Sequence, residues 1–379
     1  MKRFYNIHKS AKVVSIIIDK EAMKTDSTIQ VINGGLEIGS FPRYLCKKRG
    51  QEMVICRLND SNTNQYHDLQ TSAVDGSEGD IMNLIPEIWY KYRKIDANKF
   101  QYDICFTQPP GFKYEGGSPW VIEGEEGAWI HLPSSLYGTY KGSLVDDKIY
   151  SISGVTPVSA KTLRLMKTYC RNRGEGYDAI KYIQHMAVAL LFYARYGTLN
   201  SDNVLGNGGA TFSSSAGVTP TGTSTSTGIQ DTVKTTTNYV VGMGIEGVYG
   251  GCYEAIGDGE ANNHVLVVPD GNGGTHELQM PTSNGWVTSI HAEDGPFFDL
   301  MAKAIGGSSK TYYCDYYTQG TGIRGVSISY QDSANYGGIS TNSIGYALDF
   351  SNITVGIRLG FTGKIVEEYD VNTFKNIPI

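Results

Sequence analysis

The sequence predicts an α+β fold in which two helices pack on short, twisted antiparallel sheets joined by many loops, preceded by a small β-rich N-terminal module. Glycine and tyrosine are abundant, at 46 and 26 residues, and charged residues make up only 18% of the chain against a typical ~25%. This composition argues against helical bundles and coiled coils. Two neighbouring segments in mid-chain carry helical periodicity, and the other apolar runs are mostly short, strand-like and bounded by glycine.

The N-terminal module is expected to span residues 1–78. The stretches "AKVVSIIID" (11–19), "STIQVIN" (27–33) and "EMVICRL" (52–58) predict strands, and "NGG" after the second predicts a turn. The polar stretch that follows, "NDSNTNQYHDLQTSAVDGSEGD", has the composition of a loop or linker. Residues 79–379 are therefore expected to form a second domain.

The second domain is expected to open with a β-hairpin. "IPEIWYKYRKI" (85–95) and "NKFQYDICFT" (98–107) alternate aromatic positions around the turn "DAN". "QPPGFKYEGG" after it is irregular because it contains two prolines and three glycines. "KIYSISGV" (148–155) predicts a further strand.

Two helices are predicted next. The first, in "TPVSAKTLRLMKTYCRNRG" (156–174), has Ser159 as its expected N-cap and ends at Gly174. The second, in "YDAIKYIQHMAVALLFYARYG" (177–197), opens near Asp178 with one apolar stripe and has Gly197 as its C-cap. His185 on this helix is expected to be a core or boundary residue rather than a ligand.

The rest of the chain has less regular patterns. Residues 204–237 are rich in Gly, Ser and Thr and are expected to be a mobile, low-complexity insertion. "PDGNGG" (269–274) predicts a hairpin turn, since it lacks the ligand ladder of a calcium loop. "VYGGCYEAIGDG" (248–259) and "RGVSIS" (324–329) predict short strands broken by glycine, and "VGIRLGF" (355–361) predicts the final strand.

No pattern in the sequence predicts a catalytic or metal site. The cluster Glu123, Glu125 and Glu126 offers paired carboxylates, but it lies between glycines and is expected to be a solvated loop. "HAEDGPFFD" (291–299) offers a metal or catalytic alternative, and the favoured interpretation is a polar turn leading into a helix in "PFFDLMAKAI". Nucleophile and phosphate-loop signatures are missing from the sequence. Accordingly, no cofactor is expected.

Composition also limits the partners and the compartment. The net charge is −6 with no basic stripe, which argues against nucleic acid as a partner. Neither a signal peptide nor a membrane span is expected, because the N-terminal apolar run is short and no stretch reaches ~20 apolar residues. The six cysteines are scattered without metal-ligand spacing and are expected to be buried and reduced.

The segment 324–361 has an unusual composition. Residues 325–357 contain no Lys, Glu, Met or Trp and consist mostly of Tyr, Ser, Asn, Gly, Thr, Asp and Ile. Tyrosine supplies contact area at low entropic cost and Ser, Gly and Asn adapt to a partner, so this is the composition of an antibody-like binding surface. The sequence therefore predicts a ligand-binding segment at 324–355.

Several motifs in order resemble a known family. They are "YSISGVTP", "RNRGEGYDAI", "LLFYARYGTLNSDNVLGNG", "GIEGVYGGCYEAIGDG" and "VGIRLGF". Together they resemble the C-type-lectin-fold ligand-display proteins of phage tails and bacterial surfaces, many of them variable proteins of diversity-generating retroelements. The fold is shared with formylglycine-generating enzymes. The resemblance covers roughly residues 80–368.

The resemblance implies a C-type-lectin fold and a hypervariable segment just before the last strand. Adenine-directed mutagenesis of Asn codons would produce the observed residue types, with Gln331 as a fixed exception. The motifs of calcium-dependent sugar binding are missing, and so is the late cysteine pair of the enzyme branch, since only Cys314 lies near the end and Cys252 is the next nearest. The implied function is therefore non-enzymatic binding, with no cofactor.

On this basis the chain is expected to be a receptor-binding or cell-adhesion protein of a phage virion tail or a bacterial surface. Its partner would be a cell-surface protein or glycan, and residues 1–78 would attach it to a tail or surface or form a homo-oligomer. The alternatives are an enzyme of the formylglycine-generating type or another hydrolase, and a structural tail or surface protein without a ligand. The expected ligand-facing residues are Ser327, Ser329, Tyr330, Asp332, Asn335, Tyr336, Thr341, Ser343, Tyr346, Asp349, Phe350, Ser351 and Asn352.

Overall fold

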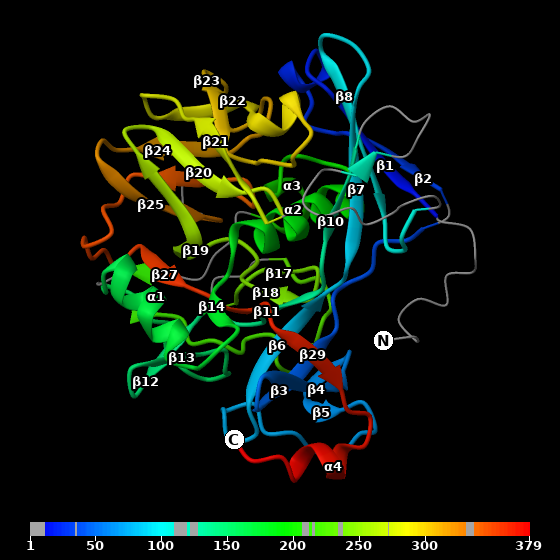
Figure 1. Cartoon of the computed structure of the whole chain (residues 1–379), viewed down its shortest axis with the longest axis vertical. Coiled ribbons are helices and arrows are strands. Elements are labelled where there is room, and N and C mark those ends of the chain that lie inside the picture. The colour runs from blue at the N-terminus through cyan, green and yellow to red at the C-terminus, as the bar shows by residue number, and fades with distance from the viewer. Residues whose placement is uncertain are drawn as a thin grey trace.

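The computed structural model describes residues 12–34, 36–109, 120–121, 128–206, 212–213, 217–233, 238–271, 273–330 and 337–379. The fold is mostly β: 41% strand and 12% helix, in several sheets of which one curls into a half-barrel. The expected C-type-lectin fold, with two helices on short sheets, is therefore wrong. Three large sheets meet around one central helix, α2 (Tyr182–Tyr196), as Figure 1 shows.

The first sheet has six strands, and all of its pairings are antiparallel. The predicted hairpin at residues 85–107 is confirmed as β7 and β8, with Tyr92 opposite Tyr102. In spatial order the strands are β2 (Gln30–Asn33), β1 (Val14–Asp19), β8 (Lys99–Cys105), β7 (Ile88–Lys94), β10 (Ala128–Leu132) and β9 (Trp120–Val121).

The second sheet joins the beginning of the chain to its end. The last strand, β29 (Lys364–Glu367), pairs in parallel with β4 (Glu52–Asn59), and Val366 lies opposite Val54. In order the sheet contains β14 (Tyr177–Ala179), β28 (Leu359–Phe361), β11 (Ser135–Gly138), β6 (Asp80–Ile85), β3 (Arg43–Arg49), β4 and β29, with β5 (Asn62–Tyr66) paired to β4.

The third sheet contains most of the C-terminal half. Its long strand β19 (Tyr253–Asn262) keeps pairing through the glycines that were expected to break it, because the register shifts between Ala255 and Glu260. A glycine is needed at 257, where an added Cβ would lie 2.9 Å from the carbonyl oxygen of Ala179. The order is β21 (Thr275–Gln279), β20 (Val265–Pro269), β19, β25 (Ile323–Ile328), β26 (Asn342–Ile344), β24 (Tyr316–Gln319), β22 (Gly285–Ile290) and β23 (Ala302–Ile305), with β27 (Val355–Ile357) beside β19.

Short elements complete the described part of the chain. The predicted turn at "PDGNGG" is confirmed, since it connects β20 to β21. The three small hairpins are β12 (Ser143–Val145) with β13 (Lys148–Tyr150), β15 (Phe212–Ser213) with β16 (Gly217–Val218), and β17 (Val241–Gly242) with β18 (Ile245–Glu246). The other helices are α1 (Leu163–Arg171), α3 (Asp202–Leu205) and α4 (Val371–Lys375), with 3-10 turns η1 (Ala22–Lys24) and η2 (His291–Asp294).

The central helix is buried on all sides. Of its 15 residues only Ile183, Arg195 and Tyr196 are not buried, so the single apolar stripe expected from the sequence understates its burial. Gly197 is confirmed as its C-cap, with a φ of +66°. The helix begins at Tyr182 rather than near Asp178, which lies in β14.

Two other helix expectations were wrong. The side chain of Thr162 caps α1 by accepting a hydrogen bond from the amide of Leu165, so Ser159 is not the N-cap. No helix forms in "PFFDLMAKAI", because Gly295–Pro296 is irregular and the chain enters β23 six residues later. Among the described residues, no helix is both long and apolar enough to cross a membrane.

The expected division at residue 78 does not coincide with separate sheets or cores. β1 pairs with β8, and β4 pairs with β29, so the N-terminal strands belong to sheets completed by later residues. Within the described residues of the expected mobile insertion, part of the stretch 219–233 is also packed. Ser224 is buried between Glu246, to which it donates a hydrogen bond of 2.7 Å, and Arg43, from which it accepts one of 2.8 Å.

Candidate functional site

Four aromatic rings form a continuous row at one end of the third sheet. Tyr330 stacks on Tyr253 with centroids 4.3 Å apart and rings 14° from parallel. Tyr346 meets Tyr253 edge-on at 5.8 Å, and Phe350 lies parallel to Tyr346 at 6.3 Å. Tyr253 is 5% exposed and Phe350 is 54% exposed, so this aromatic row leads from the core to the solvent.

The aromatic row is assembled from three segments. Tyr253 begins β19, and Tyr330 follows Ser329, whose φ of +60° ends the regular course of β25. Tyr346 and Phe350 belong to the segment 345–354, which carries no regular strand and is fixed through its main chain. The amide of Gly325 donates to the carbonyl oxygen of Tyr346 at 3.0 Å.

Helix α1 and the residues just before it hold the other side of this segment. The amide of Arg164 donates to the carbonyl of Leu348 at 3.1 Å, and the amide of Ala160 donates to that of Asn352 at 3.2 Å. Leu348 is buried beside α1 in a cluster of apolar residues. The exposed ring of Phe350 therefore projects from a backbone segment that hydrogen bonds hold on both sides.

Polar groups border the aromatic row. The hydroxyl of Tyr346 lies 3.1 Å from that of Thr354, which donates to the side-chain oxygen of Asn352 at 2.6 Å. Arg164 and Asp349 form an ion pair of 2.9 Å, and their side chains are 62% and 76% exposed. The hydrogen bond from Arg164 lowers the pKa of Asp349. Such an exposed pair stabilises the fold little and remains available to a partner.

The structure divides the expected ligand-facing residues into three groups. Asp349, Phe350 and Ser351 are exposed, while Tyr330, Tyr346 and Asn352 are half-buried. Ser327, Ser329, Thr341 and Ser343 are at most 1% exposed and do not face a ligand in this structure. Asp332, Asn335 and Tyr336 lie outside the described residues.

These four residues are buried because they lie in or beside central strands. Ser327 faces Ser343 across the β25–β26 pair, where both sides of the sheet are covered. Thr341 accepts a hydrogen bond from the amide of Gly338 at 2.8 Å and closes a turn. The hydroxyls of Ser327 and Ser329 have no hydrogen-bond partner among the described residues. Small hydroxyl side chains fit a tight interior as well as a binding surface.

Two contributors to the site were not predicted. Tyr253, at the centre of the aromatic row, comes from β19, and Arg164 comes from α1. Each lies far from residue 324 in sequence and carries no local signal of its role. Only the tertiary fold brings them together.

A buried ionic cluster fixes the strands behind the site. Glu254, the neighbour of Tyr253, pairs with Arg358 at 2.6 Å and with Lys141 at 2.7 Å, and all three are at most 2% exposed. Burial alone would raise the pKa of Glu254, but the two cations lower it to about 2. Arg358 also donates to the carbonyls of Gly138, Thr139, Glu246 and Gly247. Each charged group of this cluster has an oppositely charged partner, so the cluster stabilises the strands that support the site.

A second polar cluster holds the turn after the undescribed residues 331–336. Asp315 is 2% exposed and accepts hydrogen bonds from the amide and hydroxyl of Ser340. Next to it, His185 lies 3.0 Å through Nε2 from the carbonyl of Ile339. His185 is 1% exposed, which confirms it as a core residue. These groups attach the turn 337–341 to the body of the protein.

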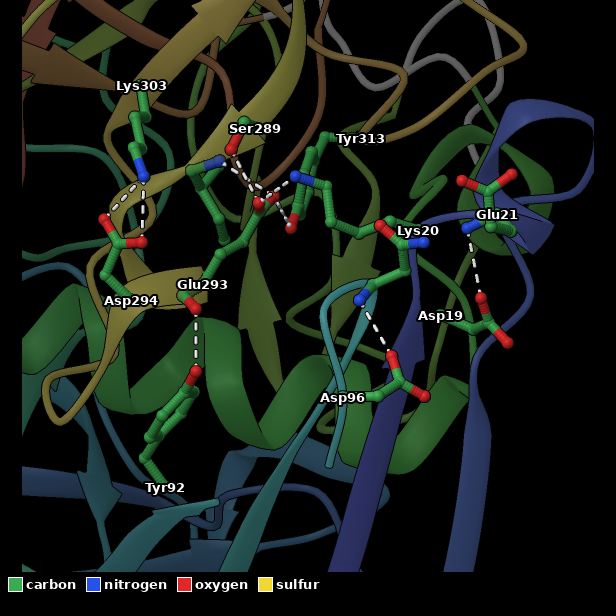
Figure 2. A network of polar contacts seen from close by, with 12 residues as sticks. Asp19, Lys20, Glu21, Tyr92, Asp96, Ser289, Glu293, Asp294, Lys303 and Tyr313 are labelled. Atoms are coloured by element: carbon green, nitrogen blue, oxygen red, sulfur yellow. Dashed lines mark hydrogen bonds and ion pairs between the residues drawn. The ribbon is translucent and has the colours of Figure 1, made fainter. Parts of the chain in front are cut away.

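The other candidates from the sequence do not form a catalytic or metal arrangement within the described residues. Glu293 of "HAEDGPFFD" accepts hydrogen bonds from Lys20 at 2.5 Å, Ser289 at 2.6 Å and Tyr313 at 2.9 Å, and its carbonyl accepts one from Tyr92, as Figure 2 shows. This network ties β1 to the third sheet.

Asp299, at the end of the same stretch, lies 2.8 Å from His276 and accepts a 2.8 Å hydrogen bond from the hydroxyl of Tyr182. No group of three or more metal-binding side chains occurs among the described residues. The six cysteines are buried and free, as expected. Glu123, Glu125 and Glu126 lie outside the described residues.

Comparison with known proteins gives no match to any protein-family model and no match among curated proteins. These comparisons do not identify the chain as a C-type-lectin-fold protein or as a retroelement variable protein.

Proposed function

We propose that this chain is a non-enzymatic ligand-binding protein and that the aromatic row is its contact surface. The observation that supports this is the gradation from Tyr253, 5% exposed, to Phe350, 54% exposed, along rings in mutual contact. A large aromatic side chain anchored in this way offers apolar contact area without first having to be ordered.

The surroundings of Phe350 suit a protein or glycan partner. Binding hot spots are enriched in aromatic residues and arginine and are bordered by polar groups. Arg164 and Asp349 supply one charge of each sign beside the ring, with Ser351 and Asn352 as further hydrogen-bonding groups. This arrangement favours a partner with mixed polar and apolar character over a strongly charged one.

The biological setting belongs to the same proposal. The composition of 325–357 supports display on a phage tail or a bacterial surface, with a receptor on another cell as the partner. The same composition supports diversification of this segment by a retroelement. A near-repeat of the coding sequence for 324–361 that differs at adenines, next to a reverse transcriptase gene, is the genomic result expected. Identical copies would contradict the diversification.

The binding proposal is tested with Phe350→Ala. The labelled chain is incubated with a panel of intact bacterial cells and with a glycan array, and retention is compared between variants. Truncation of a hot-spot side chain costs at least ~2 kcal/mol of binding free energy. We therefore expect the affinity for the target that retains the natural chain most strongly to fall about thirtyfold.

Tyr369→Ala is the matched control. Tyr369 is 53% exposed and lies near α4, away from the aromatic row, so its loss is expected to leave retention unchanged. Circular dichroism confirms that both variants keep the fold. Equal retention of Phe350→Ala and the natural chain would contradict the proposal.

A further inference from the structure

A pocket lined by described residues lies away from the aromatic row. Its volume is about 900 Å³, within the range of small-molecule sites. It opens between the β1–β2 hairpin, the segment 36–40, the last turn of α2 and residues 229–231. In Figure 1 this hairpin lies on the opposite side of the molecule from α1 and β27, which flank the aromatic row.

The wall of the pocket combines an apolar part with the polar side chains of Thr28, Asn33, Ser40 and Gln230. Side chains from β1, β2, the following segment and α2 form it, and most of them are buried or half-buried. The apolar lining consists mainly of Val14, Ile29, Val31, Leu36, Ile38 and Ala194. A ligand with an apolar body would therefore remove hydrocarbon surface from water on both sides of the contact.

The charges at the pocket favour a cation. Helix α2 ends here at residues 194–197, so the negative end of its dipole faces this region. Glu37 is exposed at the rim and has no hydrogen-bond or ion-pair partner among the described residues.

Among the described residues of the lining there is one cation, Arg195, and it is already engaged. Arg195 pairs with Asp231 at 2.7 Å and donates to the hydroxyl of Ser40 at 3.0 Å and to the carbonyl of Ile38 at 3.4 Å. Its charge is thus matched by Asp231. The carboxylate of Glu37 and the helix end remain to attract a positive group.

We propose that this pocket binds an organic ammonium ion with an apolar body, of the aralkylamine class. The apolar part lies against β2 and the 36–40 segment, and the ammonium group lies toward Glu37 and the end of α2. An anion with the same body is disfavoured, because the negative charges at the rim repel it. This inference is independent of the proposed function of the aromatic row.

The test uses phenethylamine as the probe and 3-phenylpropionate as its negatively charged counterpart, each titrated into the full chain at pH 7 and low salt. Calorimetry or saturation-transfer NMR gives the dissociation constants. We expect phenethylamine to bind at least tenfold more tightly than 3-phenylpropionate. Equal binding of the two, or no binding of phenethylamine, overturns the inference.

Two variants locate the binding. Glu37→Gln removes the rim charge and is expected to weaken phenethylamine binding about threefold to fivefold, the scale of an exposed ion pair. Glu277→Gln, which neutralises an exposed glutamate of β21 outside the pocket, is its matched control and should change nothing.

Gly39→Leu adds a bulky side chain at the lining of the pocket. Gly39 is part of the lining, has no positive φ, and an added Cβ there meets nothing within 4 Å. The variant should therefore fold normally and lose phenethylamine binding. If binding persists in Gly39→Leu, or if Glu277→Gln weakens it as much as Glu37→Gln does, the assigned pocket is wrong.

Discussion

Replacing Asp315 with Asn should make the stability of this protein less sensitive to pH. The Asp315 carboxyl is 2% exposed and lies under the turn 337–341, where Ser340 donates to it through both its amide and its hydroxyl. An asparagine side chain has nearly the same shape and can accept the same hydrogen bonds, but it never ionises. The substitution therefore isolates the effect of the charge.

The magnitude follows from the titration of Asp315. Burial raises the pKa of Asp315 from its ordinary value of 3.8 to about 8, while the hydrogen bond from Ser340 opposes the shift. Between these two values the folded protein holds a proton that the unfolded chain has released. The contribution of this group to the free energy of unfolding is complete below pH 3.8. It falls by ~1.4 kcal/mol per pH unit above that and is lost as pH rises through about 8.

Equilibrium urea unfolding at pH 5, 6 and 7 measures the effect. The free energy of unfolding of the natural chain is expected to fall by about 2.7 kcal/mol more than that of Asp315→Asn over this range. Asp349→Asn is the matched control: the Asp349 side chain is 76% exposed and its pKa is lowered, so it stays ionised throughout. Parallel pH profiles for the natural chain and Asp315→Asn would refute the reasoning.

Three further substitutions test the frame. Glu254→Gln leaves two buried cations without a full counter-charge, so we expect a loss of about 3–5 kcal/mol in the urea experiment, and an unchanged midpoint would show that the cluster is dispensable. Glu293→Gln weakens the hydrogen bond to Lys20 shown in Figure 2, so the free energy of unfolding should fall by about 2 kcal/mol. Amide exchange should become faster in β1 than in β20. Equal exchange in both strands would show that Glu293 does not tie β1 to the third sheet. Gly197→Ala forces a side chain to adopt a φ of +66°, so we expect a loss of about 1 kcal/mol, seen as a lower Tm, and an unaltered Tm would contradict the capping argument.

Local features of the fold were predictable from the sequence. The β7–β8 hairpin follows from alternating residues around a short turn, and the end of α2 follows from Gly197. The pairing of β4 with β29 has no such signal, because its partners lie more than 300 residues apart. The Ser/Thr-rich segment 217–233 was misinterpreted for a related reason: the partners of Ser224 are distant in sequence, and composition alone does not reveal them.

The candidate site was predictable only in part. The composition of 325–357 led to Phe350 and its neighbours, which are exposed as expected. Composition does not distinguish Ser351, which faces solvent, from Ser327, which is covered on a central strand, because both are small and polar. The position of a residue in a central or terminal part of a sheet decides its burial, and that position depends on non-local pairing.

The parallel pairing of β29 with β4 also constrains how the protein is made. During synthesis on the ribosome, β4 leaves the exit tunnel long before residues 364–367 exist, so the edge of β4 that pairs with β29 stays open until those residues have been made. The final residues add a second attachment, since the ammonium group of Lys47 binds three carbonyls at the end of α4, those of Phe374, Lys375 and Ile377. The sheet is therefore completed only after residues 364–367 have been made, and a premature stop codon before residue 364 would leave the edge of β4 unpaired and exposed to other nascent chains.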